Sequence, residues 1–260
     1  MFAHLKELYE TRELLLTWTR RDFRVRYSQS VLGAAWAILQ PLALMVIFSL
    51  IFSVFLKVPT DGIPYPIFAY SALLPWTLFS NSLSFAIPSL VNNMNLVSKI
   101  YFPREILPLS AILVGLADFL IASSIFIVML VVYRVDVGWA VLLVPVVLAV
   151  QILLMFGISL LAAAVNVFYR DIRFIIPLTL QLWMYVSPVI YPVSAIPEWL
   201  RPFYFLNPMA AILDAYRRVL LLKQMPDWGS LGLATLISLL LTVLAYRYFK
   251  HAEREFADLI

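Results

Sequence analysis

The sequence of 260 residues has no cysteine, two histidines and seven glycines, and only 13% of its residues are charged. Without cysteine there is no disulfide, no thiolate nucleophile and no cysteine-ligated metal. No glycine precedes a lysine, so the G-x-x-x-x-G-K-[ST] loop that wraps nucleotide phosphates is missing. His4 and His251 lie near the two ends, and no two carboxylates fall at helical spacing within an apolar stretch. These absences disfavour a membrane enzyme, and we expect no catalytic residue, metal or cofactor in this chain.

Apolar residues make up most of what is present. Hydrophobic side chains are 63% of the chain and the mean hydropathy is +0.92, whereas a soluble domain is about half apolar and about a quarter charged. So much apolar surface must meet lipid. Long apolar stretches in lipid form helices, because no water is there to bond the backbone. The expected fold class is therefore an all-α integral membrane protein.

Six stretches reach the length of about 20 apolar residues that a helix needs to cross a bilayer. They are Leu32–Phe55, Tyr65–Leu90, Ile106–Val132, Trp139–Phe168, Ile172–Tyr191 and Leu231–Phe249. The second is the weakest, because Pro75, Asn81 and Pro88 interrupt it. The fourth exceeds the needed length and is expected to emerge into water at one end. We predict one domain over residues 1–260, with a six-helix membrane region at 31–250 and a cytoplasmic tail at 251–260.

The basic residues predict the orientation, because lysine and arginine gather on the cytoplasmic side of membrane proteins. Six spans place both ends on one side, and that side then carries 13 of the 19 basic residues. They are Lys6, Arg12, Arg20, Arg21, Arg24, Arg26, Lys99, Arg104, Arg170, Arg173, Arg247, Lys250 and Arg254. The other side carries Lys57, Arg134, Arg201, Arg217, Arg218 and Lys223. Both termini are therefore expected in the cytoplasm.

Residues 1–30 are expected to form an amphipathic helix that lies in the membrane interface. At about 100° per residue, polar and apolar side chains fall on opposite arcs. The polar arc holds Lys6, Glu10, Glu13, Thr17, Arg20, Arg21 and Arg24, and the apolar arc holds Leu5, Leu8, Leu14, Leu15, Trp18 and Val25. Such a helix turns its basic face toward the headgroups. It is either a plain anchor, or it also contacts a cytoplasmic partner or guards a lateral opening. No apolar signal region occurs here, so no cleavable signal peptide is expected.

The segment Tyr191–Trp228 is expected to hold two short helices that enter the outer leaflet part-way. Asn207-Pro208 is typical of a helix cap followed by proline at the first helical position. We predict a helix from Pro208 to about Leu222, with Asp214 and Arg218 paired one turn apart, and a shorter turn over Pro197–Tyr204. Both are too short to cross a membrane, and the alternative is an ordinary loop on the outer surface. Aromatic side chains crowd this end, where they fit either an interfacial belt or a surface for sugar rings. The candidate outer-gate and glycan-contact residues are Trp183, Tyr185, Tyr191, Trp199, Phe203, Tyr204 and Asn207.

Two cytoplasmic loops are candidates for contact with a partner. In the first, Asn92–Arg104, the side chains of Leu96, Ile100 and Tyr101 are expected on one face of a short helix that Pro103 ends. Apolar side chains on such a loop need a partner or lipid to cover them. Its candidate contact residues are Asn95, Leu96, Lys99, Ile100, Tyr101, Phe102 and Arg104. The second loop offers Tyr169, Arg170, Asp171 and Arg173. Each loop either docks into a soluble ATPase or packs on lipid.

Asp118 is the one ionisable residue well inside a predicted span. A carboxylate there costs roughly 2.5–3.5 kcal/mol on insertion scales, so it must face protein or water. It either lines a passage, pairs two helices, or bonds a neighbouring Ser or Tyr. A single carboxylate is too little for ion-coupled transport, so we expect any transport energy to come from another protein.

Several segments resemble the permease subunits of type-2 ABC exporters, in the branch that exports lipid-linked polysaccharides such as O-antigen, capsule and teichoic acid. They are Leu32-Gly33-Ala34-Ala35-Trp36 with Gln40-Pro41, Leu74-Pro75-Trp76, Lys99-Ile100-Tyr101-Phe102-Pro103-Arg104-Glu105-Ile106-Leu107-Pro108, Phe168-Tyr169-Arg170-Asp171-Ile172, Ser187-Pro188-Val189-Ile190-Tyr191, Leu206-Asn207-Pro208 and Tyr216-Arg217. They occur in the family's order and extend over nearly the whole chain.

The resemblance implies a homodimer with two ATP-binding subunits, which would hold ATP and Mg²⁺, in the bacterial cytoplasmic (inner) membrane. The Asn92–Arg104 loop resembles the family's coupling helix, and the Pro197–Leu222 pieces resemble its outer gate. An undecaprenyl-linked glycan is the implied substrate. Membrane lipids are further expected partners, and no nucleic-acid partner is expected. A sister permease that exports a drug or small lipid is the main alternative, and a self-contained channel is another.

Overall fold

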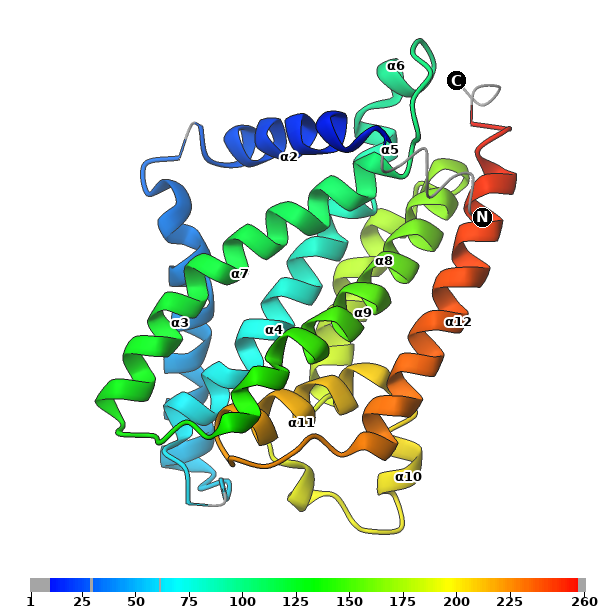
Figure 1. Ribbon diagram of the computed structural model, residues 1–260. Helices are drawn as coiled ribbons and strands as arrows, with labels where there is room; N and C mark the ends of the chain where they lie inside the picture. Colours follow the sequence, from blue (N-terminus) through cyan, green and yellow to red (C-terminus); the bar gives the residue numbers. More distant parts are fainter. Residues whose placement is uncertain (1–9, 29, 61, 257–260) are drawn as a thin grey trace.

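The computed structural model describes residues 10–28, 30–60 and 62–256, and within these ranges all regular structure is helical (Figure 1). Of the helix predicted at residues 1–30, the structure describes α2 (Arg12–Tyr27). Leu5, Lys6 and Leu8 of its two arcs lie outside the described residues, as do His4 and the last part of the predicted tail.

Four helical segments of the described chain are long and apolar enough to cross a membrane. They are Gly33–Phe55, comprising η1 (Gly33–Ala35), α3 (Trp36–Phe48) and the π-helical η2 (Ser49–Phe55); α7 (Ile106–Val132); Trp139–Phe168, comprising η3 (Trp139–Leu143) and α8 (Val144–Phe168); and α12 (Trp228–Ala252). Each matches a predicted span to within three residues at either end. The described residues thereby confirm the prediction of an all-helical fold with several helices long and apolar enough to span a membrane.

The weakest predicted span corresponds to α4 (Tyr65–Ala86), which is the central helix of the bundle. It packs against α3, α7, α8 and α11, and most of its side chains are buried. A helix enclosed by others meets protein instead of lipid, which explains why it tolerates polar residues. The predicted end at Leu90 is wrong. The helix stops at Ala86, because Pro88 has no N–H to continue the ladder, and a separate turn, α5 (Ser89–Asn92), follows.

The fifth predicted span is shorter in the structure than expected. The helix α9 (Ile172–Val186) ends before the predicted boundary at Tyr191. Ser187 is extended because it precedes Pro188, and a residue before proline avoids the helical region. Fifteen helical residues extend about 22 Å, which is less than the roughly 30 Å of hydrocarbon in a bilayer.

The interior of the bundle is filled by side chains. The largest cluster joins α4, α7, α8 and α11, with Phe79, Ile112, Met155 and Tyr216 fully buried. Close helix contacts depend on glycine at one crossing in particular. A Cβ on Gly157 of α8 would stand 3.0 Å from the backbone nitrogen of Thr242 in α12, so a larger residue there would push these two helices apart.

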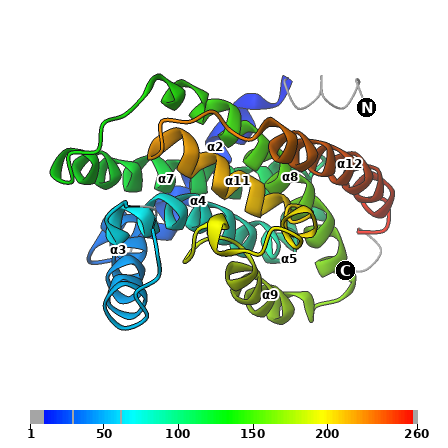
Figure 2. The same cartoon turned by 90° about the horizontal axis from the view of Figure 1, so that it is seen from below.

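Short helices lie across both ends of the bundle (Figure 1). At one end are α2, α5, α6 (Met94–Val97) and the last turn of α12. At the other are η4 (Val193–Ala195), α10 (Arg201–Tyr204) and α11 (Pro208–Leu220). Seen from below, α11 crosses the middle of the bundle (Figure 2), where it contacts α4, α8 and α12. It begins at Pro208 as predicted, with the side chain of Asn207 accepting from the Met209 N–H (3.1 Å).

Candidate functional site

The helix α2 is fastened to α7 by partly buried polar contacts. The Ser110 hydroxyl donates to Asp22 (2.9 Å). Asp118 accepts from two groups at the end of α2: Arg26 Nη1 at 2.5 Å and the Tyr27 hydroxyl at 2.7 Å. The Asp118 and Arg26 side chains are only 13% and 16% exposed. Of the roles considered for Asp118, the structure therefore places it in a contact between two helices. The tyrosine that bonds Asp118 is Tyr27, which lies far away in the sequence and not close to Asp118 in the same helix.

This contact also affects Tyr27. Burial, and next the hydrogen bond to the Asp118 carboxylate, raise the pKa of Tyr27 to about 12. The phenol therefore stays protonated, and keeps donating to Asp118, to a higher pH than an ordinary tyrosine would.

The face that α2 turns to the bundle differs in part from the predicted apolar arc. Every described member of the polar arc is exposed, as expected for a solvated face. Trp18 and Leu15 are half-buried, but Leu14 and Val25 of the apolar arc are exposed. The packing face is rotated because it includes the polar residues that have partners on α7, such as Arg26.

The first candidate loop projects from the same end of the bundle. Its helix α6 ends at Val97, so the expectation of one helical face carrying Leu96, Ile100 and Tyr101 up to Pro103 is wrong. The chain continues as a turn in which the Ile100 N–H donates to the Leu96 carbonyl (3.0 Å). Ile100 and Tyr101 are 56% and 91% exposed, although both are large and apolar or aromatic.

The other predicted residues of this loop divide between exposed and anchored positions. Asn95 and Lys99 are exposed, and Leu96 is half-buried. Phe102 turns inward and stacks on Trp18 of α2, with ring centroids 6.2 Å apart. Phe102 thus joins the loop to α2, and Ile100 and Tyr101 form its exposed tip.

A charged network that the sequence did not reveal holds the base of this loop. Arg104 donates to the backbone carbonyl of Glu253 and to that of Val97. Beside it, Lys250 Nζ lies 2.9 Å from both the Glu105 and the Glu253 carboxylates. Glu105 is completely buried. These contacts tie the loop to the end of α12, which is far away in the sequence, so no local pattern could have indicated them.

The second candidate loop is exposed. Tyr169, Arg170, Asp171 and Arg173 all present accessible side chains just before and within the first turn of α9. The guanidinium of Arg173 lies over the ring of Phe174, 4.7 Å from its centroid. The structure shows no contact between these residues and the first loop among the described hydrogen bonds and ion pairs.

At the opposite end, the structure brings together most of the predicted outer residues. Asn207 is the centre: its amide oxygen accepts from Trp183 Nε1 (2.9 Å), and its amide nitrogen donates to the Ser187 hydroxyl (3.0 Å). The Tyr204 hydroxyl donates to that of Tyr191 (3.2 Å). This arrangement connects α9 with the segment that leads into α11.

Three predicted outer residues have exposed side chains. The Tyr191 hydroxyl donates to the backbone carbonyl of Tyr185 (3.0 Å), but the Tyr185 side chain is exposed. Trp199 and Phe203 are also exposed, on and just before α10. These exposed aromatic side chains are therefore not part of the hydrogen-bonded centre at Asn207.

Arg217 of α11 is an outer residue whose role the sequence did not indicate. It is 4% exposed and donates to the carbonyls of Tyr191 (2.9 Å) and Val189 (2.7 Å). These bonds hold the non-helical segment after α9 in place, since its carbonyls have no helical partner. The predicted pair of Asp214 and Arg218 is confirmed, at 2.6 Å.

Comparison with known proteins identifies the family. The model of the ABC-2 type transporter family matches residues 13–221. The chain is similar to the O-antigen export system permease protein RfbA of Myxococcus xanthus, with 32% identity over the full length of both chains. It is similar to the protein of the same name from Klebsiella pneumoniae, with 28% identity over 95% of each chain. The polysialic acid transport protein KpsM of Escherichia coli shares 24% identity over 87% of this chain and 90% of its own. The chain belongs to the ABC-2 type transporter family.

Proposed function

We propose that this chain is the permease of an ATP-driven exporter that moves a lipid-linked polysaccharide across the bacterial cytoplasmic membrane. The observation that carries this proposal is the similarity to O-antigen export permeases over the whole chain. The lack of a nucleotide-binding loop in the sequence supports a separate ATPase, which would hold ATP and Mg²⁺. The exported glycan would be carried on undecaprenyl.

The proposed topology has six spans, with α4 and α9 as the two beyond the four long apolar segments. Both belong to the bundle: α4 packs against α7 and α8, and α9 packs against α4 and α8. The end that carries α2 and the two loops is the more basic, which favours the cytoplasm as its location. Both termini and the tail would then be cytoplasmic, and the whole chain would form one permease domain. The helices α10 and α11 would enter the outer leaflet part-way, covered by protein.

The proposed passage lies between two copies of the chain. The interior of a single bundle is filled by side chains such as Phe79 and Tyr216, so a sugar chain needs another route. The helices α3 and α9 lie on the same side of α4 (Figure 2). These two helices expose the polar side chains of Gln40, Thr179 and Gln181. Polar groups on a membrane-spanning helix are costly against lipid, and a water-filled passage formed with a second copy would solvate them.

The exposed tip of the first loop is the proposed docking point for the ATPase. Ile100 and Tyr101 offer the apolar and aromatic area that forms the centre of protein interfaces. The base of the loop is fixed to α12 through Arg104 and Glu253, so a push at the tip would reach the bundle. The second loop, with Arg170 and Asp171 exposed, would add a smaller polar contact.

At the outer end, the aromatic residues around Asn207 form the proposed gate. The bond from Trp183 to Asn207 joins α9 to the start of α11, so movement of α11 would open or close this contact. The exposed rings of Trp199 and Phe203 offer flat apolar faces for sugars at the exit.

A deletion experiment tests this function. Removing the chain from its bacterium is expected to abolish the surface polysaccharide and to cause lipid-linked glycan to accumulate inside the cytoplasmic membrane. Re-expression should restore both to wild-type levels, as measured by glycan blotting of surface and spheroplast fractions. Normal surface glycan in the deletion strain, together with loss of efflux of a drug or a small lipid, would favour the alternative substrate class.

A further inference from the structure

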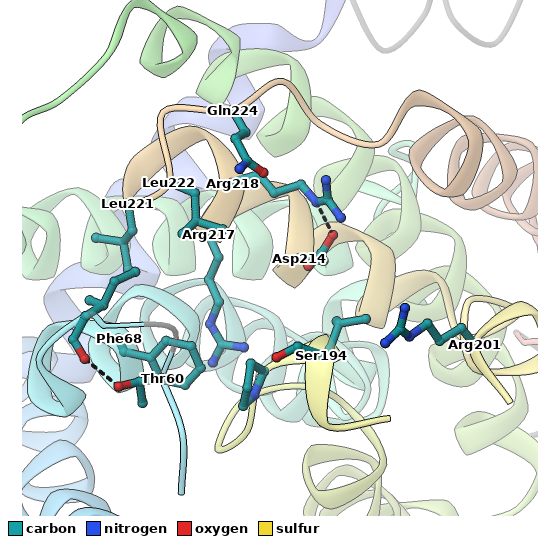
Figure 3. Close-up of a pocket in the computed structure, with 13 residues that line it drawn as sticks. Thr60, Phe68, Ser194, Arg201, Asp214, Arg217, Arg218, Leu221, Leu222 and Gln224 are labelled. Atoms are coloured by element: carbon teal, nitrogen blue, oxygen red, sulfur yellow. Dashed lines mark hydrogen bonds and ion pairs between the residues drawn. The ribbon is translucent and has the colours of Figure 1, made fainter. Parts of the chain in front are cut away.

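A cavity of about 210 Å³ beside α11 is lined by three arginines (Figure 3). Arg217 and Arg218 come from α11, and Arg201 comes from α10. Asp214 is the one carboxylate among the described residues that line it. The described lining therefore carries a net positive charge, and the hydroxyl of Thr60 and the amide of Gln224 add polar atoms. A single buried water needs about 10–15 Å³, so an anion of several heavy atoms has room.

The most buried of these cations lacks a carboxylate partner. Arg217 forms no ion pair within 4.0 Å among the described residues, and its hydrogen bonds go to neutral backbone carbonyls. Its Nε has no hydrogen-bond partner in the described part of the chain. A buried charge is stable when an opposite charge stands close by. Figure 3 shows its guanidinium beside Phe68, directed into the region between Thr60 and Ser194.

The other two arginines are only partly engaged. Arg218 uses its Nε for Asp214, at 2.6 Å, and this pair neutralises one of the three cations. Arg201 donates its Nε to the Ile196 carbonyl (3.1 Å), and its Nη1 stands 3.9 Å from Glu198, whose side chain is almost fully exposed. Figure 3 shows the Arg201 guanidinium reaching toward Ser194 and Asp214. Its outer nitrogens are therefore available at the mouth of the cavity.

We propose that this cavity binds a phosphate group, either as free phosphate or as the phosphate ester of a lipid headgroup. The charged donors converge from α10 and from α11, because the Thr60 hydroxyl before α4 already donates to the Ile63 carbonyl (2.5 Å). A tetrahedral anion with several oxygens uses such an arrangement more fully than a planar carboxylate, and arginine is the cation best suited to it. The location of the cavity at the outer leaflet rests on the proposed function. The binding chemistry of the cavity does not depend on that function.

Two phosphate probes test this site on the full chain in maltoside detergent, which contains no phosphate. Inorganic phosphate is titrated by isothermal calorimetry. Phosphatidylglycerol is compared, by native mass spectrometry, with diacylglycerol of the same acyl chains. Saturable binding of phosphatidylglycerol alone assigns the site to a lipid headgroup, and binding of inorganic phosphate alone assigns it to the free anion. Failure of both probes to bind would overturn the inference.

Variants of opposite sign separate a specific site from a folding defect. Arg201→Gln is expected to weaken binding about tenfold or more, because one charge-assisted donor is lost. Asp214→Asn is expected to tighten binding at least about threefold, because it removes a carboxylate and frees Arg218. Arg134→Gln, which removes an exposed charge outside the cavity, should change nothing. Tighter binding by Asp214→Asn cannot result from misfolding, so this variant separates a specific site from a folding defect. Equal binding by all four proteins would also overturn the inference.

One further variant addresses neutralisation by the chain itself. Asp61 adjoins Thr60 in the sequence but lies outside the described residues. If phosphate binds only after Asp61→Asn, the arginines are already neutralised and the inference is wrong. The glycan export assay keeps this test apart from the proposed function. Normal export without phosphate binding refutes the site alone, and phosphate binding without export refutes the function alone.

Discussion

Replacing Ile100 and Tyr101 together by aspartate is expected to stop export while the ATPase continues to hydrolyse ATP. The two side chains form the exposed tip of the loop between α6 and α7. If they fill a pocket on the ATPase, each substitution removes apolar area and brings an unpaired charge into the interface. Loss of one such anchor costs about 2 kcal/mol or more, which corresponds to roughly 30-fold weaker docking. Export of labelled glycan and release of phosphate, measured in the same vesicles, report the two activities separately.

A matched control separates charge from loss of the apolar tip. Asn92→Asp with Ser98→Asp adds two negative charges to exposed positions of the same loop but removes no apolar side chain. This control is expected to retain most of the export activity. The fold should be intact in both proteins, because Ile100 and Tyr101 contribute little to the core, and size-exclusion chromatography checks this. Wild-type export by the Ile100→Asp, Tyr101→Asp protein would remove this loop from the coupling path.

Replacing Asp118 by leucine is expected to destabilise the protein strongly and to loosen α2. The Asp118 carboxylate is the ion-pair partner of Arg26 and accepts from Tyr27. Removing one partner of a fully buried ion pair costs about 3–5 kcal/mol, and a smaller loss is expected here because both side chains keep some exposure. Arg26→Met combined with Asp118→Leu removes both charges and should recover most of this loss. Denaturant unfolding in detergent micelles measures all three proteins.

The exposed ion pair of Lys223 and Asp136 provides a comparison for this prediction. Its nitrogen and oxygen lie 3.3 Å apart, and both side chains are largely exposed, so Asp136→Leu should cost less than about 1 kcal/mol. Because the chain has no cysteine, spin labels on cysteines introduced at Arg20 and Leu120 report the separation of α2 and α7 directly. The separation should broaden in Asp118→Leu and stay narrow in Asp136→Leu. Equal stability and equal distances in the two variants would show that the Arg26–Asp118 pair does not hold α2.

The sequence was most informative about the long helices. An apolar run of more than 20 residues has one stable form in lipid, which is why Ile106–Val132 and Trp139–Phe168 have the same bounds in the structure as in the prediction. Where proline intervenes, apolar character alone overestimates the helix. The predicted ends at Leu90 and Tyr191 both lie beyond a proline that stops the helix, at Pro88 and Pro188.

Contacts between distant segments explain the rest. Asn207 was predictable as a cap from its position before Pro208, and the Asp214–Arg218 pair from its spacing within one helix. By contrast, the pairing of Glu105 with Lys250 depends on how α7 and α12 are placed beside each other. The burial of Arg217 depends in the same way on the segment after α9. A single sequence contains no signal for such placement.

The central claim is that this permease provides a passage and receives its energy from a separate ATPase. The most direct test reconstitutes the purified chain into vesicles with a labelled lipid-linked glycan, with and without its ATPase. In the presence of ATP and Mg²⁺, the account predicts accumulation of glycan against its gradient only when both proteins are present. Sustained uphill movement by the chain alone would contradict it.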